Sequence, residues 1–282
     1  MSTLREKRKK RTESIKTEKT ADWTVVLILC AIAVCCGGYL IYHHWSVKQR
    51  ELEYERLRQE ETLSAATETV IAEPETEENT EETVIYCDPV YDFGQLHEQN
   101  EDIYAWIVVP GTQVDYPLLQ SGTDNYYLDY NLDHSKGYPG CIYTNQCNRK
   151  DFSDYNTVLY GHNMKNGSMF GSIHSFEDET FFDEHPYIYV YTENERLTYE
   201  IYEAAKFTDV YIPSEYVISS KDDRDQFLAD VREKVSDNKL HVREDMEIGE
   251  EDRLITLSTC VSGERNHRYL VIGVLVETAL YR

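Results

Sequence analysis

The chain has few basic side chains for its size. Its 282 residues include 28 Lys or Arg against 52 Asp or Glu, which gives a formal net charge of −24. Binding to nucleic-acid phosphates requires a basic surface, so this balance argues against a nucleic-acid partner. The sequence also contains no Gly-rich phosphate-binding loop and no His-Glu-x-x-His metal-binding helix. The hydrophobic content of 41% still suffices for a packed core, which argues against a wholly disordered chain.

The charge falls into blocks along the chain. Residues 1–20 hold eight basic residues and three Glu, a balance of +5. Residues 51–83 hold twelve Glu and two Arg, a balance of −10, and residues 84–282 hold 36 acidic and 16 basic residues, a balance of −20. We interpret the blocks as four segments: a basic cytoplasmic tail (1–22), a transmembrane anchor (23–42), an acidic stalk (43–83) and an extracellular domain (84–282).

Long hydrophobic runs are also scarce, with one exception. Twenty consecutive residues from Trp23 to Tyr42 carry no formal charge, and a helix of about 20 residues spans about 30 Å of hydrocarbon. The basic cluster before this run favours a cytoplasmic N-terminus and an exported remainder. A cleaved signal peptide is the alternative, but the run exceeds a usual signal core and no small-x-small cleavage motif follows it. The sequence therefore predicts a single-pass membrane anchor.

The segment after the anchor offers little apolar surface. A helical continuation is conceivable around Leu52 and Leu57, but two leucines are too few for a convincing packing face. From Ala65 to Thr83 the chain is mostly Glu, Thr and Ala, a composition that buries little surface and repels itself. We expect an extended spacer there.

From Val84 onward the sequence predicts a mostly β domain, a barrel or a sandwich, because short β-branched and aromatic runs alternate with Gly-containing turns. Two helical patches interrupt the pattern, at Gly94–Tyr104 and at Ser220–Val235, with Ser220 as a candidate N-cap. The expected strands are 106–109, 138–143, 157–160, 187–191, 197–202, 254–257 and 269–277.

Seven cysteines are present, and three of them lie within the apolar run. The other four, Cys87, Cys141, Cys147 and Cys260, could form two disulfides in three pairings, with Cys141 and Cys147 the nearest pair. If Cys260 stays reduced, three cysteines remain outside the apolar run. Three cysteines cannot all pair, which argues against a disulfide framework. A Cys₄ zinc site is also weakly supported, because the spacing between Cys141 and Cys147 exceeds the usual two to four residues.

Cys260 ends a predicted strand, and Arg268 begins the next one. If the two strands form an antiparallel hairpin, both side chains lie at the same end of the sheet, which we call the rim. His162 ends another strand beside a glycine. A neighbouring cation stabilises the thiolate form of a cysteine, an imidazole can protonate a departing amine, and a guanidinium can stabilise an oxyanion. These three residues are therefore the candidate catalytic set.

Structural roles are an alternative to this catalytic interpretation of Cys260 and His162. A strand-end cysteine is commonly a small buried hydrophobe, and a lone histidine such as His162 is commonly a turn or capping residue. His267 is a rival base, but it neighbours Arg268 and adjacent strand residues point to opposite faces. The remaining histidines of the domain have no partner pattern and are interpreted as surface or structural: His97, His134, His174, His185 and His241.

Several motifs resemble the sortases, and class B among them. They are Tyr160-Gly-His-Asn163 with its continuation to Gly171, Thr256-Leu-Ser-Thr-Cys260 and Arg268-Tyr269. The segments Gly111–Gln120 and Asp124–Leu128 and the helical patch before the Cys260 strand also resemble class B members. The resemblance covers roughly residues 90–282. It implies a closed β-barrel with an N-terminal helix and a helix inserted before the nucleophile strand.

The resemblance also implies a mechanism and partners. Cys260 would attack the carbonyl of a Thr in a C-terminal sorting motif, and a cell-wall amine of the lipid II type would resolve the thioester. His162 would act as acid and base, Arg268 would hold the thioester carbonyl, and Thr259, Ser258 and Leu119 would contact the peptide. No metal or organic cofactor is expected. A membrane-tethered cysteine hydrolase and a non-catalytic stalked binding module remain the alternatives.

Overall fold

The computed structural model describes residues 2–65, 85–234 and 240–282, and it divides into two compact units, Met1–Leu52 and Glu53–Arg282. The first unit is helical and belongs to α1 (Ser2–Ala65). Within α1, the stretch Trp23–Gln59 is long and apolar enough to cross a membrane, with a mean hydropathy of 2.5 in its most apolar window. The apolar side chains of Trp23 to Tyr42 lie exposed on the helix, as an anchor surrounded by lipid requires.

The last part of α1 belongs to the second unit and packs against it. Tyr54 and Leu57 are buried, and the Tyr54 hydroxyl donates to the carbonyl of Gly140 at 3.2 Å. The Arg58 Nε donates to the carbonyl of Asp115 at 2.8 Å. The predicted acidic stalk is therefore helical at least to Ala65, and its portion 66–83 lies outside the described residues. The four segment boundaries read from the charge blocks stay predictions.

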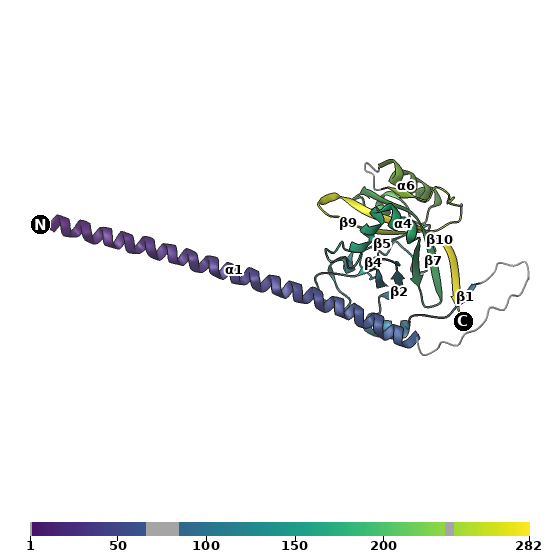
Figure 1. Cartoon of the computed structure of the whole chain (residues 1–282), viewed down its shortest axis with the longest axis horizontal. Coiled ribbons are helices and arrows are strands. Elements are labelled where there is room, and N and C mark those ends of the chain that lie inside the picture. The colour runs from purple at the N-terminus through teal and green to yellow at the C-terminus, as the bar shows by residue number, and fades with distance from the viewer. Residues whose placement is uncertain (1, 66–84, 235–239) are drawn as a thin grey trace, which may run out of the picture. The chain divides into compact units, whose positions relative to one another are not determined.

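The second unit is a β-barrel (Figure 1). Eight of the ten strands in the described ranges form a closed ring in the order β10-β9-β5-β4-β3-β2-β6-β7, which β7 and β10 close by antiparallel pairing. Strand β1 extends the sheet beside β10, and β8 extends it beside β7. The strands are β1 (Ile85–Cys87), β2 (Ile103–Val108), β3 (Asp115–Leu119), β4 (Ile142–Thr144), β5 (Asn156–Tyr160), β6 (Tyr187–Tyr191), β7 (Glu195–Thr208), β8 (His241–Val242), β9 (Leu254–Val261) and β10 (Glu264–Tyr281).

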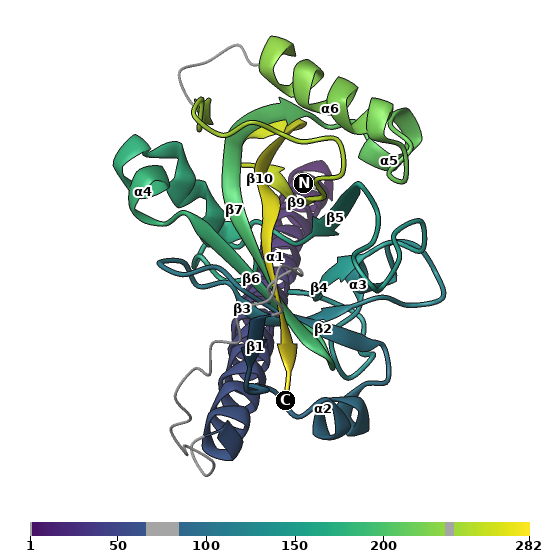
Figure 2. The same ribbon diagram turned by 90° about the vertical axis from the view of Figure 1, so that its right-hand side faces the viewer.

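Helices occupy the connections between the strands. Figure 2 shows α5 and α6 together at one end of the barrel, above β7 and β10. The fold thus combines a closed barrel, an N-terminal helix and a helix before β9, as the family resemblance implies. The helical segments of the second unit are α2 (Phe93–Gln99), α3 (Tyr126–Asp129), the 3₁₀ helix η1 (Gly171–Glu177), α4 (Glu179–Glu184), α5 (Ile212–Glu215) and α6 (Lys221–Lys234).

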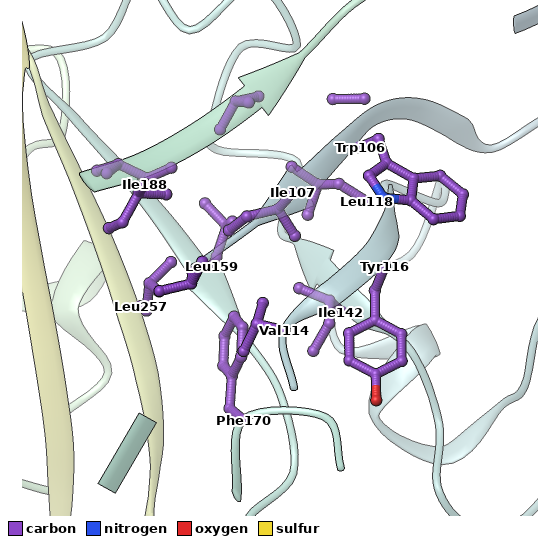
Figure 3. Packing of buried hydrophobic residues seen from close by; sticks show 14 of the residues in the cluster. Trp106, Ile107, Val114, Tyr116, Leu118, Ile142, Leu159, Phe170, Ile188 and Leu257 are labelled. Atoms are coloured by element: carbon purple, nitrogen blue, oxygen red, sulfur yellow. The ribbon is translucent and has the colours of Figure 1, made fainter. Parts of the chain in front are cut away.

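Strands β9 and β10 are buried on both faces. Leu257 and Val271 face the barrel interior, and Figure 3 shows Leu257 among the interior side chains of neighbouring strands. Leu270 and Ile272, on the alternate face of β10, pack in a second cluster with Phe227 of α6. Because successive strand residues point to opposite faces, a strand covered on both sides reads as a continuous apolar run. This explains why the run after Arg268 contains so few polar residues.

Several element boundaries differ from the sequence expectation: β7, β9 and β10 are longer than expected and β2 begins earlier. Two further differences have a clear local cause. The expected helix 94–104 ends at Gln99, because the buried Asn100 is extended and its amide donates to the Tyr127 hydroxyl and the Leu132 carbonyl. The expected strand 138–143 begins only at Ile142, since Gly140 before it has a left-handed φ of 67°. Ser220 is confirmed as a cap of α6: its hydroxyl accepts from the backbone N–H of Asp223 at 3.3 Å.

Candidate active site

The β9–β10 hairpin brings Cys260 and Arg268 together. The two residues are direct partners in the antiparallel register, as the hairpin prediction requires. Directly opposed residues project from the same face of the sheet with Cβ atoms about 5 Å apart. The hairpin turns at Gly263, whose φ of 83° favours glycine. The Cys260 side chain is exposed, although the six preceding residues of β9 are buried.

His162 reaches the same rim from the parallel neighbour of β9. Tyr160 of β5 pairs with Ser258 of β9, so His162 and Cys260 each lie two residues beyond this matched pair. The His162 Nε2 lies 2.8 Å from the carbonyl oxygen of Leu128. A carbonyl oxygen only accepts, so we assign the proton to Nε2. Nδ1 is then the nitrogen left for proton transfer.

The Arg268 guanidinium is turned toward its own hairpin. Its Nη1 donates to the carbonyl of His267 at 2.9 Å and to that of Arg265 at 3.3 Å. The neighbouring His267 is engaged elsewhere, because its Nδ1 lies 3.0 Å from a carboxylate oxygen of Glu264. Arg268 therefore supplies a cation at the rim, and its guanidinium must swing from these carbonyls to reach an acyl group on Cys260.

Two further residues contact the Cys260 backbone: Asn163, which ends the Tyr160–Asn163 motif and was assigned no role, and His174, which lies outside the motifs. The Asn163 Nδ2 donates to the Cys260 carbonyl at 2.8 Å, and the His174 Nε2 lies 3.0 Å from the same oxygen. His174 was expected to be surface or structural. Its contact with Cys260 spans 86 positions of sequence, and no local pattern signals it.

The expected substrate-contact residues have buried side chains. The Thr259 hydroxyl donates to the carbonyl of Gly161 at 2.8 Å, which ties β9 to the loop that carries His162. Ser258 is buried one residue earlier, and Leu119 lies in the barrel core on β3. A role for these three residues in peptide binding stays a prediction.

A set of tyrosines lies beside the rim. The rings of Tyr143 and Tyr160 are 5.6 Å apart, and those of Tyr160 and Tyr211 are 6.2 Å apart. Burial raises the pKa of the Tyr211 hydroxyl to about 12. Burial also raises the pKa of Tyr143, with smaller contributions from Tyr211 and Asp129. These phenols therefore stay protonated at neutral pH, and the Tyr143 hydroxyl donates to the Asn125 side-chain oxygen at 3.0 Å.

All seven cysteines lie in the described part of the chain, and none of them forms a disulfide. Burial raises the pKa of both Cys87 and Cys147, which disfavours their thiolate forms. Within the described ranges, no group of three or more His, Cys, Asp or Glu residues could hold a metal ion.

Comparison with known proteins agrees with this geometry. The model of the Sortase domain family matches residues 107–276. Sortase B of Listeria monocytogenes is 34% identical over 168 residues, which cover 58% of this chain and 65% of that protein. The chain therefore spans slightly less than two thirds of the Listeria relative. Sortase B of Staphylococcus aureus is 26% identical over 261 residues, which cover 91% of this chain and 97% of that protein.

Solved structures give the same result. A Staphylococcus aureus sortase B–substrate complex superposes with a TM-score of 0.64 at 25% identity, covering 82% of this chain and 97% of that one. Clostridium perfringens sortase B superposes with a TM-score of 0.59 at 30% identity, covering 66% of this chain and 100% of that one. The protein thus belongs to the sortase family of cysteine transpeptidases, and its relatives are class B sortases.

Proposed function

We propose that this chain is a membrane-anchored transpeptidase that cleaves a C-terminal sorting motif after Thr. It transfers the acyl group from a Cys260 thioester to a cell-wall amine of the lipid II type, which anchors secreted proteins at a Gram-positive surface. The peptide class is supported by the relative from Staphylococcus aureus, which was solved as a substrate complex.

The observation that carries the proposal is the position of Cys260. Its thiol is exposed at the end of a strand whose preceding side chains are buried, and Arg268 lies directly opposite in the ladder. His162 leaves the adjacent parallel strand at the same level. A nucleophile, a proton carrier and a mobile guanidinium cation thus share one rim, which is the minimal set for acyl transfer through a thioester.

In the first half of the reaction, the Cys260 thiolate attacks the carbonyl carbon of the motif's Thr. Negative charge then develops on the carbonyl oxygen, where the Arg268 guanidinium stabilises it. The C–N bond breaks as the protonated His162 gives its Nδ1 proton to the departing amine. The products are a Thr thioester on Cys260, a free C-terminal peptide and a neutral His162.

In the second half, the acceptor amine attacks the thioester carbonyl and loses a proton to His162. The C–S bond breaks, the thiolate of Cys260 is restored, and a new amide joins the Thr to the acceptor. Atoms and charges balance over the cycle: one amide bond is exchanged for another. Water in place of the amine would give a free acid, which defines the hydrolase alternative.

The membrane assignment rests on α1. Its apolar stretch follows eight basic residues within the first 20 positions, and positive charge concentrates on the cytoplasmic side of membrane spans. We therefore place the N-terminus inside and the barrel outside. A membrane-impermeant thiol label applied to intact cells tests this orientation. We expect Lys136→Cys to be labelled and Ser14→Cys to be protected. Labelling of Ser14→Cys but not of Lys136→Cys would contradict the assignment.

The activity is tested with a pentapeptide library and triglycine, with products read by mass spectrometry. Amide products that form only with triglycine support transpeptidation, whereas acid products alone support the hydrolase. Cys260→Ala is the matched control and should abolish both products while leaving the fold intact. No cleavage by the wild-type chain, together with an alkylation-resistant Cys260, would support the non-catalytic binding module.

A further inference from the structure

The carbonyl of Cys260 lies where the β5–β9 ladder ends. Parallel pairing of these strands stops at Tyr160 and Ser258, and the N–H of Gly161 reaches back to the Ser258 carbonyl at 3.3 Å. Strand β9 continues for three more residues, to Val261. Cys260 therefore lies beyond the backbone donors of β5, and side chains must take over the hydrogen bonding of its carbonyl if the strand end is to stay ordered.

Asn163 supplies this hydrogen bond. Its Nδ2 is 2.8 Å from the Cys260 carbonyl, 3.0 Å from the His174 Nε2 and 3.2 Å from the Ser262 hydroxyl. Only the amide nitrogen, not the amide oxygen, is compatible with a carbonyl partner, so the orientation of the side chain is fixed by its surroundings. The two hydrogens of Nδ2 match the two nearest acceptors, the carbonyl oxygen and the imidazole nitrogen.

Glu177 sets the proton on His174. A carboxylate oxygen of Glu177 lies 2.8 Å from the His174 Nδ1. An ionised carboxylate only accepts, so Nδ1 carries a hydrogen. Nε2 lies 3.0 Å from both the Asn163 Nδ2 and the Cys260 carbonyl oxygen. In the neutral ring Nε2 accepts from Asn163, and in the protonated ring it donates to the carbonyl. The ring plane is held by stacking on Tyr269, with centroids 4.9 Å apart and planes 24° apart. Glu177 thus orients His174, and His174 and Asn163 together hold the Cys260 carbonyl.

We propose that Glu177, His174 and Asn163 form a relay that positions the nucleophile by holding the main-chain carbonyl of Cys260. This inference rests on the proposed function, in which Cys260 is the nucleophile. The three residues are positioning residues: Asn163 and His174 contact the backbone of Cys260, and Glu177 acts through His174. They lie on the loop after β5 and on η1, which are separate from the strands that carry Cys260 and Arg268.

The relay acts on the reaction through geometry. If the Cys260 peptide plane rotates, the Cβ atom of Cys260 moves with it. The sulfur then approaches the acyl carbon from a different direction. A misplacement of about 1 Å at a reacting atom can lower the rate about 100-fold. A hydrogen bond to the carbonyl opposes this rotation during both halves of the cycle, so losing it should lower kcat and leave binding of the sorting peptide nearly unchanged.

The test compares variants of the full-length chain in detergent micelles. Asn163→Asp keeps the shape of the side chain but places an acceptor against the carbonyl. His174→Gln keeps a polar side-chain end near the Nε2 position, whereas His174→Phe keeps the stack on Tyr269 and loses both nitrogens. Ser262→Ala is the matched control, since it removes only the third and most distant acceptor near the Asn163 amide. The assay is cleavage of the best pentapeptide from the library, with thermal melting to verify folding.

We expect Asn163→Asp and His174→Phe to lower kcat roughly 10- to 100-fold with KM for the peptide changed less than about twofold. His174→Gln should keep kcat within about threefold of wild type, and Ser262→Ala within about twofold. The relay is refuted if Asn163→Asp cleaves at the wild-type rate, or if His174→Phe outperforms His174→Gln, which would mean that only ring stacking matters. If Asn163→Asp does not fold, the pair of His174 variants still decides.

A second readout is independent of the sorting peptide. The rate at which iodoacetamide alkylates Cys260 is measured as a function of pH. Mass spectrometry monitors the tryptic peptide 254–265, which contains Cys260 and none of the other six cysteines. Asn163→Asp introduces a carboxylate beside the nucleophile, so the midpoint of the pH profile should rise by roughly one unit. An unchanged profile would refute the contact. Failure of the wild type to cleave any peptide would instead refute the proposed function and leave this measurement valid.

Discussion

Glu203 makes the stability of the barrel depend on pH. It lies on β7 with 0% of its surface exposed, and neither carboxylate oxygen has a hydrogen-bond partner among the described residues. The nearest cation is Arg232, whose Nε is 3.6 Å from Oε2. Burial raises the pKa of Glu203 from 4.5 to about 7, and Arg232 only partly opposes this rise.

The size and sign of the effect follow from this pKa. The difference of about 2.5 units corresponds to about 3 kcal/mol at about 1.4 kcal/mol per unit. Below pH 4.5 the carboxyl is protonated in both the folded and the unfolded chain, so folding has no charge-burial cost. Between pH 4.5 and 7 the unfolded chain loses the proton first, so the free energy of unfolding falls as pH rises. The full loss of about 3 kcal/mol is reached above pH 7.

Glu203→Gln removes the titration and keeps the shape of the side chain. The measurement is denaturant unfolding of a fragment that begins at Glu53, for wild type and variant, at several pH values from 4 to 8.5. The amide has its own burial cost, but this cost is independent of pH and cancels from the slope. We expect the variant to gain about 3 kcal/mol relative to wild type over this range. A difference that stays constant with pH would refute the reasoning.

Three further outcomes are expected from the site and its supports. Arg268→Ala and His162→Ala should each lose most of the transfer activity, about 100-fold in kcat, and near-normal turnover of Arg268→Ala would require another oxyanion stabiliser. Thr259→Val should lower the free energy of unfolding by about 1–2 kcal/mol, because the Gly161 carbonyl loses its buried donor; a calorimetric melt checks this. Leu57→Ala should cost about 2–5 kcal/mol through the cavity it leaves where α1 packs on the barrel unit, and an unchanged melting temperature would contradict that packing.

Much of the geometry of the candidate active site could be predicted from the sequence. Cys260 and Arg268 flank a short turn between two apolar runs, so hairpin pairing alone places them opposite each other, and the observed register confirms this. His162 follows a strand that ends in a glycine, a local pattern that marks a strand end. These predictions succeeded because each depends on residues within about ten positions of one another.

The relay could not be predicted in this way. Asn163 and His174 meet Cys260 across separations of 97 and 86 residues, and they do so only because β5 and β9 pair in parallel. Closure of the barrel by β7 and β10 is also a long-range event, with register shifts at Ile272/Gly273 and Leu275/Glu277 that no residue pattern announces. The burial of Leu57 has the same origin, since its partners lie in the barrel unit and not on α1.

The pairing of β1 with the end of β10 has a mechanical consequence. Ile85–Cys87 run parallel to Ala279–Tyr281, whereas the partner of Cys260 is Arg268 at the other end of the same strand. Eleven residues of strand separate Arg268 from Ala279, roughly 35 Å along the chain. Tension applied through the chain before β1 therefore loads three residue pairs in shear, far from the nucleophile. Force from the membrane span would reach the contacts of Tyr54 and Arg58 with the barrel unit before it reaches these pairs. The domain is thus attached at two successive places, and the β1 pairs lie at the end of β10 opposite to Arg268.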